Sequence, residues 1–386
     1  MSKRPHSNSE LDESATKRRD TRHVESFSVR PAQHYAGRCA IYKQPVEINS
    51  YSIDGERCVW FDDRELKQYH PIRIDGTTPS LSTGFERFVK RDDTVAEHLD
   101  TLLDAITDAK RKKRALGDLD IVTWRGIMTK IFCTPYARNE PWQLRVSRSN
   151  GTIYMEEVAL PGKKEREANA TRREQMMSYW GYRFEGLCTN DPDGSANTNI
   201  QYCVIVKTRL GKNNILMGAE VDCIDGPKSK EPLKQYIELK TSRHIENSRQ
   251  QYSFERYKLL KFWAQSFLVG VPRVVCGFRD DDGSLTKTET LKTLEIPRRV
   301  RDKPNMWDAS VCLNFADQFL DWLRTVVTVD DPNTTYSVEW KEPFKEITVR
   351  YNGRIGAFLT QRYFDGDVSH NIGGPRVSLS SLSSNT

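Results

Sequence analysis

Charged residues alternate with apolar residues in two short runs of this chain. Glu220 and Asp222 lie in one run, and Glu238 and Lys240 lie in a second run about a hairpin's length further on. Because successive side chains of a β-strand point to opposite faces, the two members of each pair share one face of a strand. If the two strands pair with each other, three carboxylates and one ammonium group converge.

The residues around these charges, such as Ile215, Val221, Ile237 and Leu239, are typical of a protein core. A charge placed there is costly unless another group neutralises it, and hard oxygen ligands suit Mg²⁺ or Mn²⁺. Metal-dependent phosphate chemistry is therefore one interpretation. The other is a half-exposed antiparallel strand, in which alternating polarity and a Glu-x-Lys pair are ordinary on the solvated face.

Three further polar residues fit the first interpretation, although each also has a structural explanation. Gln265 lies in the middle of a nearly apolar helix, where it could position a water or be a core amide bonded to backbone. Arg125 could clamp a phosphate with two N–H groups or form an ion pair within the core. Glu185 could bind a metal or simply end an aromatic helix.

The chemistry explains why these groups would be gathered. Cleavage of a phosphodiester or phosphoanhydride needs a water in line and stabilisation of charge on the phosphoryl oxygens and the leaving group. Carboxylates would hold one or two divalent ions, and an ammonium group would counter the developing charge. The expected ligands are Glu185, Asp222 and Glu238, with Glu220 as a further ligand or water-orienting group and Lys240 facing the phosphate.

Length and composition limit the class of protein. The 386 residues are enough for one large domain or two of ordinary size. The 59 basic and 53 acidic residues leave a formal charge of +6, so any nucleic-acid binding is local. Eight cysteines without a Cys-x-x-Cys pair and seven histidines without ligand spacing argue against zinc sites and a disulfide framework. No apolar stretch approaches membrane-spanning length, so we expect a soluble intracellular protein without a membrane partner.

Three segments are expected along the chain. Residues 1–30 read as a disordered polar tail, residues 31–366 as one domain, and residues 367–386 as a disordered Ser-rich tail. The first tail carries Lys3-Arg4 and Lys17-Arg18-Arg19, the layout of a two-part nuclear import signal, although a merely solubilising tail has the same composition. We therefore predict a nuclear protein, or otherwise a cytoplasmic one.

Between the tails, strands outnumber long helices and do not alternate strictly with them. This pattern indicates an α/β (α+β) fold in which helices flank a mixed β-sheet core, with a second, smaller sheet. The expected helices span residues 93–114, 123–133, 163–187, 250–269 and 308–328, and the expected strands include 201–209, 214–224, 234–242 and 273–279.

Five motifs in order resemble the DXO family of RNA 5′-end decapping enzymes, including the fungal members that accompany the nuclear 5′-to-3′ exoribonuclease. An acidic residue, a spacer of 15 residues and then Glu-x-Lys also match the PD-(D/E)XK arrangement of active-site strands. The similarity runs from about His34 to Phe364 and misses both tails. The motifs are Thr123-Trp-Arg-Gly126, Gly181-Tyr-Arg-Phe-Glu185, Gly218-Ala-Glu-Val-Asp-Cys223, Tyr236-Ile-Glu-Leu-Lys-Thr-Ser242 and Lys258-Leu-Leu-Lys-Phe-Trp-Ala-Gln-Ser-Phe-Leu-Val-Gly-Val-Pro272.

The resemblance implies a set of site residues. The catalytic set would be Glu220, Asp222, Glu238, Lys240 and Gln265, and the metal ligands Glu185, Glu220, Asp222, Glu238 and the backbone carbonyl of Leu239. Substrate contacts would be Arg57, Glu97, Trp124, Arg125, Gly126, Cys203, Glu220, Lys240 and Gln265. Arg57, Glu97 and Cys203 rest on weaker local matches, and for each the structural explanation is the stronger one, namely a surface ion pair for Arg57 and Glu97 and a core thiol for Cys203.

The resemblance also implies an activity. Family members remove pyrophosphate from triphosphorylated RNA, incompletely methylated caps, and nucleotide caps such as NAD, and some then degrade the RNA from its 5′ end. The expected protein is therefore a Mg²⁺- or Mn²⁺-dependent hydrolase of RNA 5′ ends. Two other hypotheses are a stabilising partner of the nuclear exoribonuclease with weak activity of its own, and a PD-(D/E)XK nuclease that cuts DNA.

Overall fold

The computed structural model describes residues 24–74, 78–191 and 196–369. In this described part, ten strands form a large mixed sheet, in which β4 runs parallel to both of its neighbours and the other neighbouring pairs are antiparallel. From one edge to the other, its strands are β1 (Val24–Ser28), β14 (Glu346–Gly353), β13 (Asp331–Trp340), β5 (Trp142–Ser149), β6 (Thr152–Glu157), β4 (Ile121–Trp124), β8 (Asn213–Glu220), β7 (Gln201–Leu210), β2 (Val46–Ile53) and β3 (Val59–Trp60).

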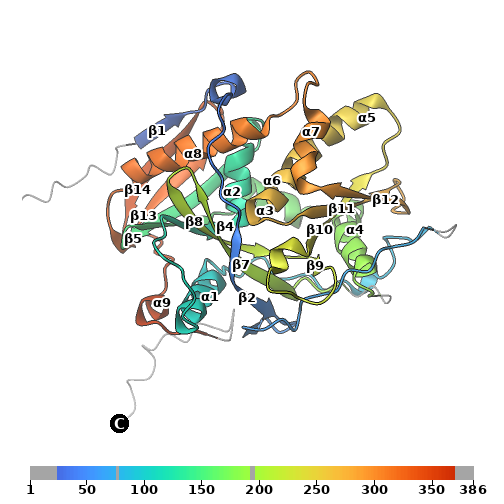
Figure 1. Ribbon diagram of the computed structural model, residues 1–386, viewed down its shortest axis with the longest axis horizontal. Helices are drawn as coiled ribbons and strands as arrows, with labels where there is room; N and C mark the ends of the chain where they lie inside the picture. The colour runs from blue at the N-terminus through green and yellow to red at the C-terminus, as the bar shows by residue number, and fades with distance from the viewer. Residues whose placement is uncertain (1–23, 75–77, 192–195, 370–386) are drawn as a thin grey trace, which may run out of the picture.

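A second sheet lies beside the large one (Figure 1). Over the described ranges it has four strands, in the order β12 (Leu285–Lys292), β11 (Arg273–Arg279), β10 (Tyr236–Arg243) and β9 (Cys223–Ile224). β10 and β11 are parallel, and the other two pairings are antiparallel. The prediction of a mixed-sheet α/β fold with a second, smaller sheet is therefore confirmed.

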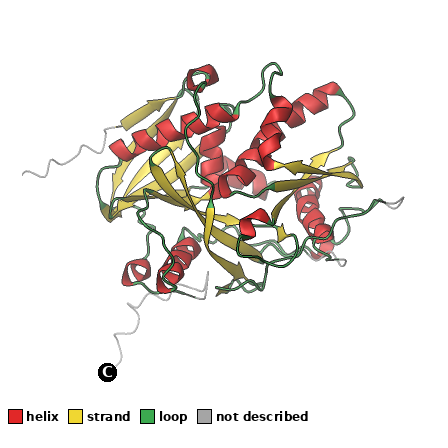
Figure 2. Cartoon of the chain, viewed as in Figure 1, coloured by secondary structure: helices red, strands yellow, loops and turns green. Residues whose placement is uncertain are grey.

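Helices cover both faces of the sheets (Figure 2). The apolar residues of α2, α6 and α8 form one core with a face of the large sheet, and those of α1 and α9 form another core with its opposite face. α4 packs on the outer face of the small sheet. The helices are α1 (Asp100–Arg111), α2 (Arg125–Cys133), α3 (Pro161–Ala168), α4 (Arg172–Cys188), α5 (Ser248–Ser253), α6 (Leu259–Val269), α7 (Ile296–Val300), α8 (Ala309–Val326) and α9 (Gln361–Asp365), with a π-helical turn, η4 (Phe254–Lys258), between α5 and α6.

Strand β8 illustrates how the sequence pattern produces the layers. Ile215 and Met217 point into the core under α2, α6 and α8, whereas Leu216 between them joins the core under α1. Gly218 follows, and a Cβ atom there would lie 2.4 Å from the Trp124 ring. The glycine therefore lets Trp124 lie directly against the strand that ends at Glu220.

Several predicted boundaries are wrong. Val24–Ser28, assigned to the N-terminal tail, form β1 and pair with β14. The helix predicted over residues 93–114 begins at Asp100, and Val95, within the predicted range, is 44% exposed. The helix predicted over residues 163–187 is two helices, because Thr171 caps a new helix with the reciprocal Thr171–Glu174 hydrogen bonds of a capping box.

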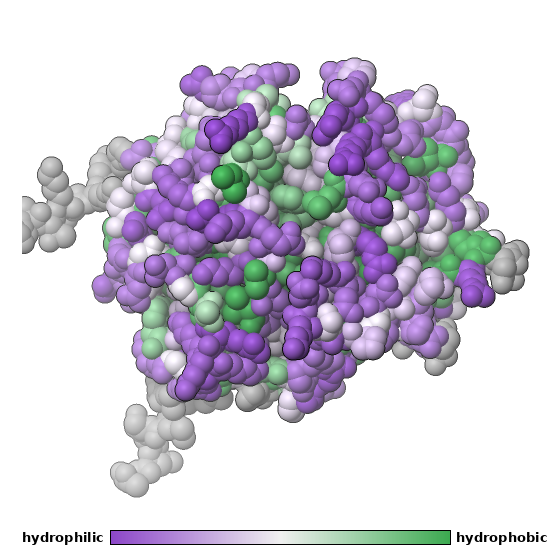
Figure 3. Space-filling view, in the orientation of Figure 1, coloured by the Kyte–Doolittle hydropathy of each residue, from purple (hydrophilic) through white to green (hydrophobic). Residues whose placement is uncertain are grey.

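The face drawn in Figure 3 is mostly hydrophilic, with small hydrophobic patches between polar side chains. Across residues 24–74, 78–191 and 196–369, no helix is long and apolar enough to span a membrane. The two basic clusters of the predicted import signal lie outside the described residues, as does most of the predicted C-terminal tail.

Candidate active site at the junction of two sheets

The acidic strands meet at the junction of the two sheets but do not pair as predicted. β8 belongs to the large sheet and ends at Glu220, and the chain then enters the small sheet as β9, which pairs with β10. The single strand predicted over residues 214–224 is thus divided between two sheets. Asp222 lies at the crossing, where its Oδ2 accepts a hydrogen bond of 2.6 Å from the Leu239 N–H. The acidic residues of the two runs therefore come together because Asp222 is hydrogen-bonded to β10, and not because β8 pairs with β10.

Glu238 and Lys240 lie on one face of β10, as the alternation predicted. Lys240 Nζ is 2.5 Å from Glu238 Oε1, and Arg125 at the start of α2 donates to both Glu238 oxygens at 3.3 and 3.2 Å. The Glu238 side chain is only 2% exposed. Although burial opposes its ionisation, Arg125 and Lys240 lower the pKa of Glu238 to about 2. Arg125 thus forms an ion pair, which was the structural alternative to a phosphate clamp. This ion pair lies within the candidate site.

The other carboxylates have the opposite electrostatic environment. Burial, with the nearby charge of Glu238, raises the pKa of Asp222 to about 7. Burial, with Asp222 and Glu220, raises the pKa of Glu185 well above its usual range. Glu220 is accessible at a cavity wall, but the surrounding protein restricts its hydration and raises its pKa. All three line one cavity of about 500 Å³. Burial and mutual repulsion therefore disfavour the charged forms of these three carboxylates.

This donor set fits a hard divalent cation, because carboxylate oxygens are its preferred ligands and a bound cation would favour the charged forms that burial and repulsion disfavour. Glu185, Glu220, Asp222 and Glu238 are the residues that would hold it, with the Leu239 carbonyl. Within the described residues, no three His, Cys, Asp or Glu side chains already form a cluster that encloses an ion. Asp222 is held by the Leu239 N–H, Glu238 by Arg125 and Lys240, and Glu220 by Gln201.

A second cavity of about 510 Å³ adjoins the first and shares Glu220 with it. Trp124, Cys203 and Glu97 line it, and Cys203 lies opposite Glu220 in the β7–β8 register. Cys203 is also a buried thiol, as the core-thiol explanation of this residue predicted. The predicted substrate residues Glu97, Trp124 and Cys203 are therefore brought together with the acidic cluster.

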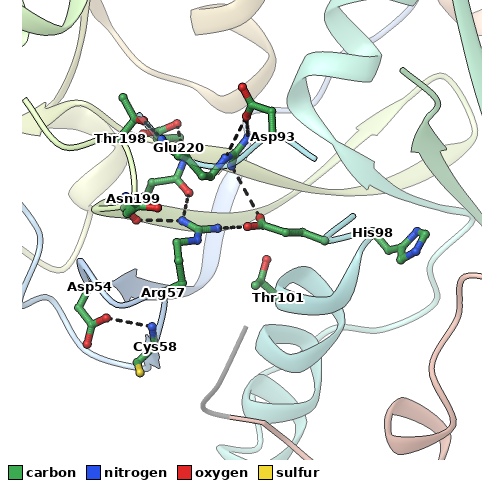
Figure 4. Close-up of polar contacts among 12 residues, drawn as sticks. Asp54, Arg57, Cys58, Asp93, His98, Thr101, Thr198, Asn199 and Glu220 are labelled. Atoms are coloured by element: carbon green, nitrogen blue, oxygen red, sulfur yellow. Dashed lines mark hydrogen bonds and ion pairs between the residues drawn. The ribbon is translucent and has the colours of Figure 1, made fainter. Parts of the chain in front are cut away.

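Arg57 and Glu97 form an ion pair at the edge of this cavity (Figure 4). Their Nη2 and Oε1 atoms are 2.5 Å apart, and the Arg57 side chain is only 12% exposed, so this is not the surface pair of the alternative explanation. Arg57 has φ +62°, which is unfavourable for a residue with a side chain, and its Nε has no hydrogen-bond partner in the described part of the chain. Strain and an unsatisfied donor are typical of functional positions.

Gly126 and Gln265 line a third, smaller cavity of about 240 Å³ between α2 and α6. Of the two explanations for Gln265, the core amide does not hold, because Gln265 is half-buried and faces this cavity. Gly126 directly follows Arg125, but Gln265 does not line the cavity of Glu185, Glu220 and Asp222, so the structure does not bring it together with them.

Two residues that the sequence analysis did not consider, Gln201 and Arg91, line both cavities that Glu220 joins. Gln201 donates to Glu220 Oε2 at 3.0 Å. It precedes Cys203 by two positions on β7, so the same alternation that grouped Glu220 with Asp222 would have placed it on the Cys203 face. Arg91 lies in a loop, where no periodic pattern marks it.

Comparisons with known proteins agree with this geometry. Residues 43–364 match the family described as RAI1-like PD-(D/E)XK nuclease. The chain is 38% identical to the decapping nuclease RAI1 of Neurospora crassa over 326 residues, covering 78% of each protein. It is 39% identical to the human decapping and exoribonuclease protein over 329 residues, covering 82% of the chain and 83% of the relative.

Solved structures give the same result. Candida albicans Rai1, in complex with pU5 and Mn²⁺, superposes with a TM-score of 0.79 at 27% identity, over 89% of this chain and 98% of the other. Scheffersomyces stipitis Rai1, in complex with (3′-NADP)⁺ and calcium, gives a TM-score of 0.80 at 28% identity, over 89% and 99%. The resemblance inferred from the motifs is thus confirmed. The chain belongs to the RAI1-like family of PD-(D/E)XK nucleases.

Proposed function

We propose that this protein is a divalent-metal-dependent hydrolase of RNA 5′ ends. One observation carries the proposal: four carboxylates, Glu185, Glu220, Asp222 and Glu238, converge with a lysine and an arginine where the two sheets meet. The relatives named as decapping nucleases, and the neighbour solved with pU5 and Mn²⁺, support it.

The side chains divide the work of hydrolysis between them. A divalent ion, when bound by the carboxylates, supplies a Lewis acid that neutralises phosphate charge and lowers the pKa of water. Although burial disfavours the charged forms of Lys240 and Arg125, Glu238 raises the pKa of both, so they stay cationic. These two cations stabilise the negative charge that develops when water attacks phosphorus and the leaving group departs. Trp124 and Cys203 give the adjoining cavity an apolar wall against which a nucleoside can pack.

We further propose that the substrates are 5′-triphosphorylated RNA, incompletely methylated caps and NAD-type caps, with 5′-to-3′ degradation of the RNA as a possible second step. The same attack on phosphorus serves each, and the phosphate held at the carboxylates decides which bond breaks. The predicted nuclear location and exoribonuclease partner stay predictions.

The substrate proposal is tested by incubating the protein and Mn²⁺ with RNAs that differ only at the 5′ end. Triphosphate, cap, NAD and monophosphate ends should release pyrophosphate, a cap dinucleotide, an NAD-derived nucleotide and mononucleotides, respectively. Duplex DNA of the same sequence is the control and should stay intact. Cleavage of the DNA, with all four RNAs unchanged, would favour the DNA-nuclease hypothesis instead.

Metal binding should release protons at low pH. Because the folded protein holds the pKa of Asp222 at about 7, this carboxyl is mostly protonated at about pH 6 and must lose its proton to ligate an ion. We therefore expect Mn²⁺ to bind more tightly as the pH rises toward about 7, with about one proton or more released per ion at about pH 6 and fewer at about pH 8. Calorimetry in two buffers of different ionisation enthalpy measures this number. Equal proton release at both pH values would contradict the prediction.

A further inference from the structure

A continuous series of side-chain contacts joins the Glu97–Arg57 ion pair, at the edge of the second cavity (here called the substrate cavity), to Glu220 in the wall of the same cavity. Glu97 Oε1 pairs with Arg57 Nη2 at 2.5 Å, and Arg57 Nη1 donates to Gln201 Oε1 at 2.7 Å. Gln201 Nε2 then donates to Glu220 Oε2 at 3.0 Å. Arg57 Nη1 also donates to the Asn199 carbonyl at 2.9 Å, which fixes the guanidinium beside β7 (Figure 4).

The chemistry of the partners fixes the orientation of the Gln201 amide. A guanidinium only donates hydrogen bonds and a carboxylate only accepts them, so the amide must turn its oxygen to Arg57 and its nitrogen to Glu220. The reversed orientation would place N–H against N–H on one side and oxygen against oxygen on the other. Arg57 and Glu220 therefore select the same orientation of the amide, and Arg57, which is also bonded to Glu97 and Asn199, anchors its oxygen.

Backbone geometry places Gln201 at this position. Gln201 and Cys203 lie on the same face of β7, and Cys203 is the register partner of Glu220 on β8. On the other side, Gln201 is the register partner of Ile53 at the end of β2, and Arg57 belongs to the turn between β2 and β3. The neighbouring strands β2, β7 and β8 therefore hold the amide between the turn that carries Arg57 and the end of the strand that carries Glu220.

We propose that Gln201 is a positioning residue that couples Arg57, at the substrate cavity, to the Glu220 carboxylate. When a substrate anion draws the Arg57 guanidinium away, the Gln201 amide oxygen loses the partner that anchors it, and the amide then holds Glu220 less firmly. The relay makes the orientation of a metal-binding carboxylate depend on the occupancy of the substrate cavity. This inference rests on the proposed function in one respect, namely that Glu220 takes part in binding the divalent ion.

A double-substitution cycle on Mn²⁺ affinity tests the relay without measuring activity. Gln201→Met should weaken Mn²⁺ binding to the metal-free protein by about tenfold, as expected when a residue that orients a metal ligand is lost. Arg57→Lys keeps the charge but loses the planar fork of donors, so it should weaken Mn²⁺ binding about threefold or more when Gln201 is present. In the Gln201→Met background, Arg57→Lys should change the affinity by less than about twofold. Calorimetry gives the four dissociation constants.

Gln143→Met on β5 is the matched control, because it makes the same substitution at a partly buried position of the same sheet, outside the site. It should leave Mn²⁺ affinity unchanged and preserve the effect of Arg57→Lys. Gln201→Asn is a second variant in case the methionine protein does not fold, since its shorter amide cannot reach both partners. Additive effects of the Arg57 and Gln201 substitutions would overturn the relay alone. Absence of Mn²⁺ binding in the unsubstituted protein would overturn the proposed function as well.

Discussion

Replacing Glu220 and Asp222 together by alanine should lower kcat/KM for triphosphorylated RNA by about a thousandfold or more. Both carboxylates line the cavity that also contains Glu185. Asp222 also accepts a hydrogen bond from the Leu239 N–H, which connects β10 to the segment that crosses between the sheets. Loss of the charge stabilisation that a bound ion supplies is worth several kcal/mol, and each 1.4 kcal/mol of barrier is about a tenfold change in rate. Pyrophosphate release from triphosphorylated RNA measures the effect.

The fold should survive this double substitution. Glu220 is accessible, and the raised pKa of Asp222 means that its negative charge is unfavourable in the folded state. Asp225→Ala with Glu231→Ala is the matched control, because it removes two exposed acids from the same connection between β8 and β10. The control protein should keep its activity within about threefold, since exposed ion pairs contribute little. Full activity in the Glu220/Asp222 variant would refute the assigned site.

The alternation of charges was sufficient to predict the strands that build the site. Glu238 and Lys240 share a face of β10 because strand geometry fixes which side chains point together. The same rule could not say which strands pair, because β8 and β10 occupy different sheets, and β9 and Asp222 connect them. Pairing depends on how the whole chain packs, which two local patterns do not encode.

The contacts between distant segments were the other part that local patterns could not supply. The ion pairs of Arg125 with Glu238 and of Arg57 with Glu97 join residues far apart in sequence. The role of Gln201 could not be predicted for a different reason. Its strand was predicted, but its role depends on contacts with Arg57 and Glu220, which come from two other segments. The helix break before Thr171 was readable, because Thr-x-x-Glu is a local capping signal.

Glu238→Gln should be the most destabilising single substitution in the site. Glu238 is almost fully buried and neutralises both Arg125 and Lys240, which are 13% and 25% exposed. An amide in its place leaves two cations facing each other with little solvent, and breaking a buried pair from one side costs about 3–5 kcal/mol. We expect a corresponding decrease in the free energy of unfolding at about pH 7, measured by urea denaturation, together with loss of hydrolysis.

The pH dependence of this loss identifies its cause. The folded pKa of Glu238, about 2, is below the ordinary value of 4.5, so its stabilising effect is complete above about pH 4.5 and disappears as the pH falls toward 2. The difference between the two proteins should therefore be constant near neutrality and shrink in acid. A difference that does not change with pH would mean that packing, rather than charge, causes the loss.

Glu255→Gln separates stability from activity. Glu255, with an 8% exposed side chain, pairs at 2.7 Å with Lys303, which is 45% exposed, so the substitution removes another buried carboxylate, with a smaller expected cost, at a position not assigned to the site. It should lower stability but retain hydrolysis when assayed well below its unfolding midpoint. If Glu255→Gln abolishes hydrolysis to the same extent, the inactivity of Glu238→Gln reflects lost stability and not the chemistry of the site. If only Glu238→Gln is inactive, the carboxylate that Arg125 and Lys240 neutralise is required for the reaction itself.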